Sequence, residues 1–217
     1  MRNKKKQFLV LGLGRFGASV AQNLCRLGHE VLAVDSDEQL VNDVAPYVTK
    51  AIQADATDEN ALLMMGVSDY DAAVVAIGSN IRDSILVTVL CKEAGVPQVI
   101  AKAVDELHAK VLRKVGADKV VFPERDMGQR VARLLDTPNI LEMMELSDEF
   151  QIAEVLVPER WCGHSLAEIN VRRDYHLTIV GIRREGVFRV SPGAHEVFQA
   201  HDILIVLGRQ RDIDLID

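Results

Sequence analysis

The chain has 217 residues, 48% hydrophobic and 26% charged, the balance of an ordinary globular protein that can bury a core. Its formal net charge of −7 argues against general binding of nucleic acid through the phosphate backbone. No apolar run approaches the roughly 20 residues needed to span a bilayer, and the three scattered cysteines suit neither a disulfide framework nor a zinc site. We therefore expect a soluble, cytoplasmic protein.

Six short apolar runs, separated by helical patterns, occupy the chain up to about residue 122. Their spacing of about 20 to 24 residues is typical of strand–helix–strand units, and their Val/Ile/Ala/Leu content suits strands buried on both faces. We predict an α/β domain with a doubly wound, parallel, Rossmann-type sheet in the order 3-2-1-4-5-6. Because parallel strands end at the same edge, the strand ends should gather there and form the ligand site. These ends fall near Gly12, Asp35, Asp55, Gly78, Lys102 and Pro123.

The first run leads into a GxGxxG motif, which continues into a helical pattern. Gly12 permits a tight turn, Gly14 lets the backbone approach a phosphate, and Gly17 lets the helix pack on the strand. A phosphate would then lie at the amino end of that helix. Asp35 ends the second run, where its carboxylate can accept hydrogen bonds from ribose hydroxyls and disfavours a 2′-phosphate. These features together predict an adenine-nucleotide site.

The other strand ends extend this predicted site. Asp55 and Ala56 could meet the base, and Lys102 could neutralise a phosphate. Glu124 could stabilise the start of its own helix, or it could bind Mg²⁺ or a similar cation beside a phosphate. Lys102 and His108 could instead be solvated side chains. The predicted site also includes Phe16, Ser36, Asp37, Ile77, Gly78, Ser79, Ala103, Val104 and His108.

Arg15 places a long cationic side chain inside the glycine motif. Backbone amides already satisfy the pyrophosphate of a bound NAD, whereas a guanidinium suits an additional charge such as a terminal phosphate. A solvated loop arginine is the alternative. The sequence contains no GxSxG, HExxH or paired CxxC motif, and its C-terminal histidines show no pairing with a nucleophile. We expect a nucleotide-binding protein without catalysis. The alternative is a small NAD-dependent oxidoreductase or redox-sensing enzyme.

The pattern changes after the sixth run. Pro123 opens a helix that ends at Asp136, which closes a nucleotide-binding domain of residues 1–136. Residues 137–148 are expected to link the domains through a short amphipathic helix, Asn139 to Leu146, that packs on its own domain or on a second subunit. Residues 149–217 should form a small α+β domain. It should contain the strands QIAEVLVP, HLTIVGIRR, VFRVSP and DILIVLG, a hairpin turn at 184–186 and a small helix at 165–170.

Several of these stretches together resemble a known family. The stretches GLGRFG, HEVLAVD, ADATDE, VAIG, GADKVVFPE and PERDMG, followed by a small β-rich domain, resemble the RCK (TrkA-type) regulatory subunits of Trk/Ktr potassium transporters. The resemblance covers essentially the whole chain and is greatest to the short Ktr-type subunits.

The resemblance implies a homo-oligomer, built from dimers into a ring of eight subunits. The ring would dock on the cytoplasmic face of a membrane potassium-translocating subunit. It further implies that ATP or ADP, or NAD(H) in some members, binds the strand edge and changes the shape of the ring. The family's nucleotide positions correspond to Arg15, Asp35, Asp55, Ile77 to Ser79, Lys102, His108 and Glu124. Cyclic di-AMP binds the C-terminal domain of related subunits, in the region that corresponds to Asn170, Arg172 and Ile179.

Overall fold

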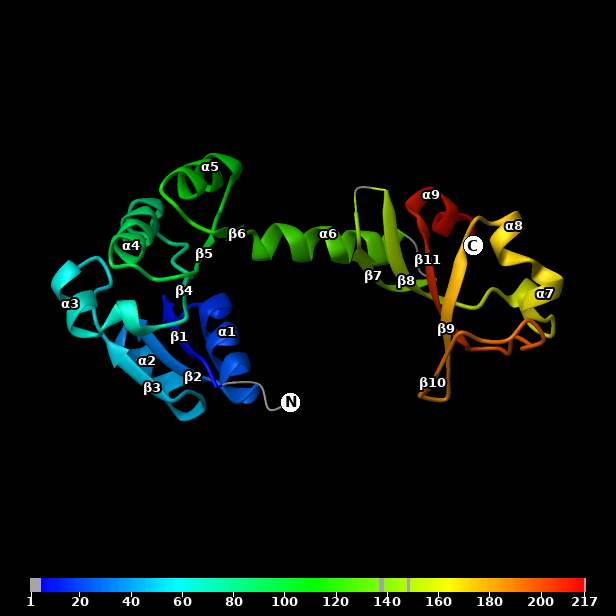
Figure 1. Cartoon of the computed structure of the whole chain (residues 1–217), viewed down its shortest axis with the longest axis horizontal. Helices are drawn as coiled ribbons and strands as arrows, with labels where there is room; N and C mark the ends of the chain where they lie inside the picture. Colours follow the sequence, from blue (N-terminus) through cyan, green and yellow to red (C-terminus); the bar gives the residue numbers. More distant parts are fainter. Residues whose placement is uncertain (1–4, 137–138, 148, 217) are drawn as a thin grey trace. The chain divides into compact units, whose positions relative to one another are not determined.

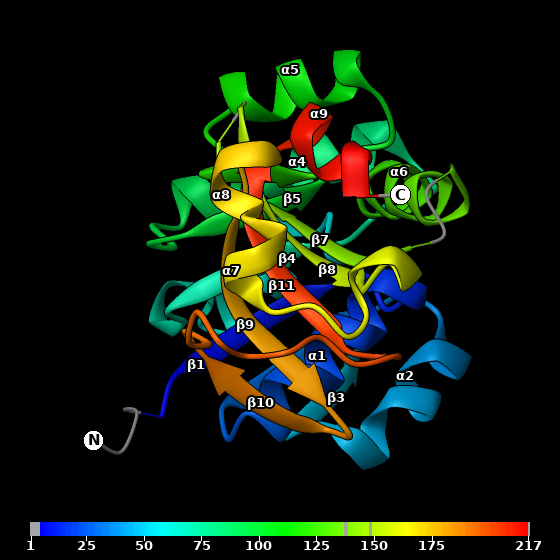
Figure 2. The same ribbon diagram turned by 90° about the vertical axis from the view of Figure 1, so that its right-hand side faces the viewer.

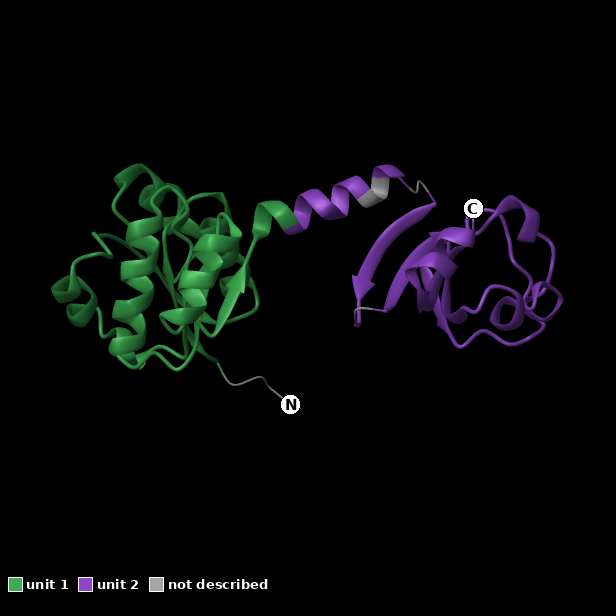
Figure 3. Ribbon diagram, turned by 90° about the horizontal axis from the view of Figure 1, so that it is seen from above, with its two compact units in different colours: residues 1–125 green, residues 126–217 purple. Residues whose placement is uncertain are grey.

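The computed structural model describes residues 5–136, 139–147 and 149–216. It divides into two compact units, residues 1–125 and 126–217 (Figure 3). Each unit has its own sheet and its own hydrophobic core. In the described part of the chain, no helix combines the length and the apolar character needed to cross a bilayer.

The first unit contains a parallel sheet with the strand order β3-β2-β1-β4-β5-β6, which confirms the predicted order (Figure 1). Leu9 and Leu11 pack on one face of the sheet and Val10 on the other, since successive side chains of a strand alternate. The strands described for this unit are β1 (Gln7–Leu11), β2 (Glu30–Asp35), β3 (Lys50–Gln53), β4 (Ala72–Val75), β5 (Val99–Lys102) and β6 (Lys119–Val121).

Helices cover both faces of this sheet. Helices α1 (Arg15–Arg26) and α2 (Glu38–Val44) contribute to the core on one face. Helices α3 (Glu59–Met64), α4 (Ile81–Glu93) and α5 (Glu106–Lys114) contribute to the core on the other. Four of these helices begin at a side-chain cap that accepts a backbone N–H, which fixes where each loop ends. The caps are Asp37, Asp58, Asn80 and Asp105.

The second unit contains an antiparallel sheet in the order β10-β9-β11-β8-β7, with α8 against β9 and α9 against β8 and β11 (Figure 2). Its four predicted strands, the helix at 165–170 and the hairpin turn are confirmed. Glu185 and Gly186 both have positive φ, 48° and 80°, as a two-residue hairpin turn of type I′ requires. The elements are β7 (Ile140–Glu145), β8 (Phe150–Leu156), α7 (Leu166–Ile169), α8 (Val171–Asp174), β9 (Thr178–Arg184), β10 (Val187–Val190), β11 (Ile203–Arg209) and α9 (Gln210–Ile213).

The prediction of a helix between Asn139 and Leu146 is wrong. Residues 140–145 form β7, which pairs antiparallel with β8. Apolar residues at 140, 141, 143 and 144 fit a helical period, but pairing with a strand that follows in the chain satisfies the backbone groups and buries Ile140. The preceding helix, α6 (Pro123–Asp136), has the predicted limits and continues from the first unit into the second.

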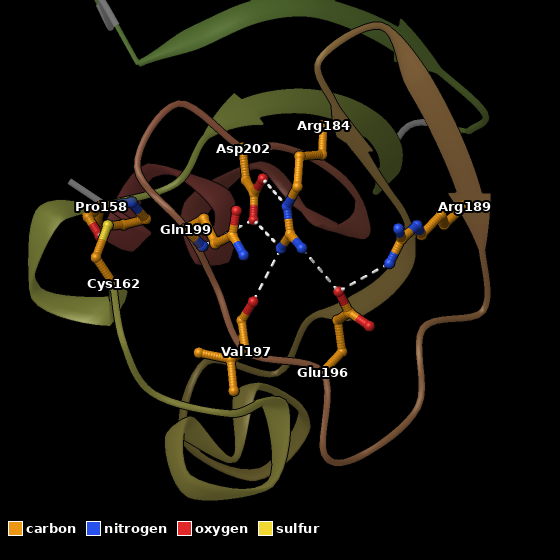
Figure 4. Close-up of polar contacts among 8 residues, drawn as sticks. All are labelled: Pro158, Cys162, Arg184, Arg189, Glu196, Val197, Gln199 and Asp202. Atoms are coloured by element: carbon orange, nitrogen blue, oxygen red, sulfur yellow. Dashed lines mark hydrogen bonds and ion pairs between the residues drawn. The ribbon is translucent and has the colours of Figure 1, made fainter.

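A buried ion pair lies in the second unit (Figure 4). The Asp202 side chain is 0% exposed, and its two carboxylate oxygens accept hydrogen bonds from Arg184 Nε at 2.8 Å and Nη2 at 2.7 Å. The backbone N–H of Gln199 donates a third, at 2.9 Å. Burial raises the pKa of the Asp202 carboxyl, but Arg184 and the Gln199 amide together lower it below the usual value. Asp202 is therefore ionised at neutral pH.

Candidate functional site

The carboxyl ends of the strands in the first unit surround a cavity of about 510 Å³. Loops after β1, β2, β3 and β4 contribute to its wall, together with the end of β5 and the start of α6. The structure brings fourteen of the predicted site residues together here. They are Gly12, Gly14, Arg15, Phe16, Asp35, Ser36, Asp37, Asp55, Ala56, Ile77, Gly78, Ser79, Lys102 and Glu124.

The three glycines of the motif meet three different surroundings. Gly12 has φ of 95°, and a Cβ there would lie 3.0 Å from the backbone nitrogen of Ile77. A Cβ at Gly17 would lie 1.8 Å from the carbonyl oxygen of Gly12, so the first turn of α1 packs directly on the loop. A Cβ at Gly14 would have no protein atom within 4 Å, and Gly14 lines the cavity. Gly14 therefore leaves room for a ligand to approach the backbone at the start of α1.

Asp35 joins the glycine loop to the end of β2. Its Oδ2 accepts a hydrogen bond from the backbone N–H of Leu13 at 2.6 Å, and its Oδ1 accepts one from Asp37 at 2.9 Å. A carboxylate oxygen can accept a second hydrogen bond. Asp35 can thus hold the loop and still receive two hydroxyl groups from a ligand.

Asp55 is held by Thr57, two residues further along the loop. Its Oδ1 accepts hydrogen bonds from the Thr57 hydroxyl at 2.7 Å and from the Thr57 backbone N–H at 2.8 Å. These bonds lower the pKa of the Asp55 carboxyl, so the group is anionic at neutral pH. Asp55 is therefore a fixed acceptor in the part of the cavity next to α3.

Charged side chains of both signs occupy the wall near β5 and α6. Lys102 Nζ lies 2.6 Å from Glu124 Oε1, and the side chain of Lys102 is 13% exposed, whereas that of Glu124 is 63% exposed. The hydrogen bond from Lys102 holds the pKa of Glu124 below its usual value, with a smaller contribution from Arg15. Within the described residues, the guanidinium of Arg15 makes no hydrogen bond or ion pair. Arg15 is thus a cation available to an anionic ligand.

Four predicted site residues do not line the cavity: Gly17, Ala103, Val104 and His108. Gly17 is buried under the loop, as its packing requires. His108 is 2% exposed, and its Nδ1 accepts a hydrogen bond from the Val104 backbone at 3.4 Å. Burial lowers the pKa of His108, and its Nε2 has no partner among the described residues. Burial thus separates His108 from the cavity although it follows β5 closely.

Some residues of the cavity wall are absent from the sequence-based prediction. Asp83 is the charged member of this group, and it lies in the first turn of α4. The sequence offers one signal for it, because an acid soon after a strand end can face the same edge as the loop. The other members are Val34, Leu40, Ala54, Thr57 and Ala76.

A second cavity, of about 530 Å³, lies in the second unit beside α8 and β9. Asn170, Arg172 and Ile179, the residues predicted for a second ligand, all line it. Its other lining residues are Leu166, Val171, Leu177, Thr178, Val180, Ser191 and Pro192.

Comparison with known proteins assigns each unit to a domain. Residues 8–123 match the TrkA-N domain, and residues 152–217 match the TrkA-C domain. The chain is 44% identical over 212 residues to the Ktr system potassium uptake protein A of Bacillus subtilis (strain 168). This match covers 98% of the chain and 96% of the relative.

Solved structures share the fold at lower identity. The GsuK channel bound to NAD matches with a TM-score of 0.67 and 18% identity, over 98% of this chain and 39% of the longer GsuK chain. GsuK bound to ADP matches with a TM-score of 0.54 and 18% identity, over 63% of this chain and 36% of that chain. These similarities establish the Rossmann-like first unit and the small antiparallel second unit as a known combination.

Proposed function

Because this chain belongs to the TrkA-N/TrkA-C (RCK) family, we propose that it is the nucleotide-sensing regulatory subunit of a Ktr-type potassium uptake system. A relative of 44% identity is named as a potassium uptake protein. Proteins of this kind are not enzymes, and the chain regulates transport without a reaction of its own. The observation that carries the nucleotide assignment is the cavity itself, which is lined by the glycine loop, by Asp35 and by Arg15. The Arg15 guanidinium has no hydrogen bond or ion pair within the described residues.

The cavity chemistry supports ATP and ADP as the ligands. Asp35 supplies acceptors for ribose hydroxyls, Gly14 leaves room for phosphate at the start of α1, and Arg15 supplies a charge for a terminal phosphate. NAD(H) is the alternative ligand, and GsuK has been solved both with NAD and with ADP. Arg15 favours the ligand with the additional phosphate.

Glu124 is the group proposed to bind Mg²⁺ or a similar cation. Among the described residues, no group of three or more His, Cys, Asp or Glu side chains is placed to hold a metal ion. A cation at Glu124 would therefore need phosphate oxygens of the nucleotide as further ligands, which is usual for Mg²⁺. Binding there would compete with the Lys102 ammonium for the same carboxylate.

Replacing Arg15 with alanine should weaken ATP binding about 10- to 150-fold while leaving adenosine binding nearly unchanged, because a charged hydrogen bond contributes about 1.5–3 kcal/mol.

Asp35→Ala should weaken the binding of both ATP and adenosine, since both ligands carry the ribose. Glu124→Gln should remove the effect of Mg²⁺ on ATP affinity and leave ADP affinity nearly intact. Isothermal titration calorimetry with adenosine, ADP and ATP measures each of these changes.

Arg26→Ala is the matched control for Arg15→Ala. Arg26 is an exposed arginine at the opposite end of α1, so the variant removes the same charge away from the cavity. The ratio of ATP to ADP affinity should fall in Arg15→Ala and stay constant in Arg26→Ala. An unchanged ratio in Arg15→Ala would show that the arginine does not recognise the terminal phosphate.

The proposed partners are further copies of this chain and a membrane potassium-translocating subunit. We expect dimers that assemble into a ring on the cytoplasmic face of the membrane. Exposed apolar side chains at Met127, Val131 and Leu135 lie four residues apart along α6, and Met144 is exposed on β7. Apolar side chains on one helix face in this arrangement suit burial against a second subunit.

The cavity beside α8 is proposed to bind a cyclic dinucleotide across a two-fold axis between two second units. Light scattering should give at least the mass of a dimer, and titration of the full chain with cyclic di-AMP should give one ligand for two chains. Arg172→Ala should weaken this binding at least about tenfold, whereas Arg173→Ala should not, because Arg173 is paired with Asp174 and does not line the cavity. A stable monomer, or no heat at high ligand concentration, would contradict the proposal.

A further inference from the structure

Asp83 is a carboxylate in the cavity wall of the first unit with no assigned role. It is half-buried in the first turn of α4, and within the described residues its carboxylate makes no hydrogen bond or ion pair. A partly buried charge without a partner costs free energy. As an acid in the first turn of α4, Asp83 also interacts favourably with the helix dipole, but it is not the cap. The Asn80 side chain caps the helix by accepting hydrogen bonds from the backbone N–H groups of Arg82 and Asp83.

The other charges that line the cavity determine how the Asp83 carboxylate can act on a bound ligand. Arg15 and Lys102 are the cations that line the cavity, and Lys102 is already paired with Glu124. Arg15 and Asp83 are therefore opposite charges in one cavity, and neither is bound to a neighbour in the described structure. The cavity has a volume of about 510 Å³, so a ligand bound in it lies within the Debye length of roughly 8 Å from charges on its wall. Salt therefore screens these charges only in part.

We propose that Asp83 is a selectivity determinant of this cavity, which weakens binding in proportion to the phosphate charge of the nucleotide. Arg15 attracts a terminal phosphate and Asp83 repels it, so the two side chains together set the ratio of ATP to ADP affinity. This role rests on the proposed nucleotide function. It requires that neutralising Asp83 strengthens binding of phosphorylated ligands and leaves the nucleoside unaffected.

Asp83→Asn tests this role, because asparagine has nearly the same shape and no charge. The full chain is titrated with adenosine, ADP and ATP at low ionic strength with a chelator present. Adenosine affinity should change less than about twofold, ADP affinity should rise about two- to fivefold, and ATP affinity should rise further, up to about tenfold. These gains should shrink as salt is added, since salt screens the repulsion.

Asp43→Asn is the matched control. Asp43 is an exposed carboxylate on α2 that does not line the cavity, so this variant makes the same change in net charge outside the site. An unchanged ATP-to-ADP ratio in Asp83→Asn, or an equal rise in Asp43→Asn, would overturn the proposal. Weaker ATP binding in Asp83→Asn would also overturn it, because the carboxylate would then attract rather than repel. Wild-type protein that binds none of the three ligands would instead contradict the nucleotide function itself.

Discussion

Replacing Arg184 with alanine should lower the free energy of unfolding of the second unit by about 3–5 kcal/mol. The side chain of Asp202 is 0% exposed and depends on Arg184 for two of its hydrogen bonds. Removing one partner of a buried ion pair leaves the other charge desolvated and unpaired, and that loss is of this size. Arg184 also donates hydrogen bonds to the Val197 carbonyl and to Glu196, so the β10–β11 connection loses these two contacts with β9 in the same variant.

Arg189→Ala supplies the control for this prediction. Arg189 contacts the same Glu196 from β10, but its side chain is 57% exposed against 19% for Arg184. An exposed pair contributes about 0–1 kcal/mol, so Arg189→Ala should have little effect. Chemical denaturation of the full chain, followed through the buried Trp161 of the second unit, measures both variants. Equal losses in the two variants would show that the Arg184–Asp202 pair has no special role.

Local patterns predict the first unit well because each of its strands is a short apolar run followed by a loop. The order of the sheet and the gathering of strand ends follow from the handedness and connectivity of strand–helix–strand units. The glycine motif and Asp35 are recognisable for the same reason, since each occupies a fixed place after a strand. The sequence therefore predicts which loops form the cavity.

Non-local packing determines the features that sequence patterns do not predict. β7 is a strand because β8 pairs with it, although its apolar spacing also fits a helix. His108 comes only six residues after the end of β5, which makes it a predicted site residue. Its ring is nevertheless buried where α5 packs on the sheet. Asp83 lies within the first turn of α4, beyond the loop that follows β4, and still lines the cavity. Burial and side-chain direction thus depend on contacts between segments that are distant in the chain.

Gly17 and Gly14 of the glycine motif should respond differently to replacement by alanine, the first through stability and the second through ligand binding. In Gly17→Ala the new methyl group would lie 1.8 Å from the carbonyl oxygen of Gly12, a backbone atom that cannot move without shifting the whole loop. Forcing a methyl group into packed structure costs about 1–3 kcal/mol and sometimes more. Gly17→Ala should therefore lower the stability of the first unit and weaken adenosine, ADP and ATP together.

Gly14→Ala should leave stability nearly unchanged and act on the phosphorylated ligands. Gly14 has φ of −60°, which alanine adopts without strain, and a Cβ there would meet no protein atom within 4 Å. The methyl group would occupy the space in which phosphate approaches the start of α1, so ADP and ATP affinity should fall at least about tenfold, with adenosine affected less. Denaturation and calorimetry on both variants separate the two effects. Unchanged ADP affinity in a folded Gly14→Ala protein would place the phosphate elsewhere in the cavity.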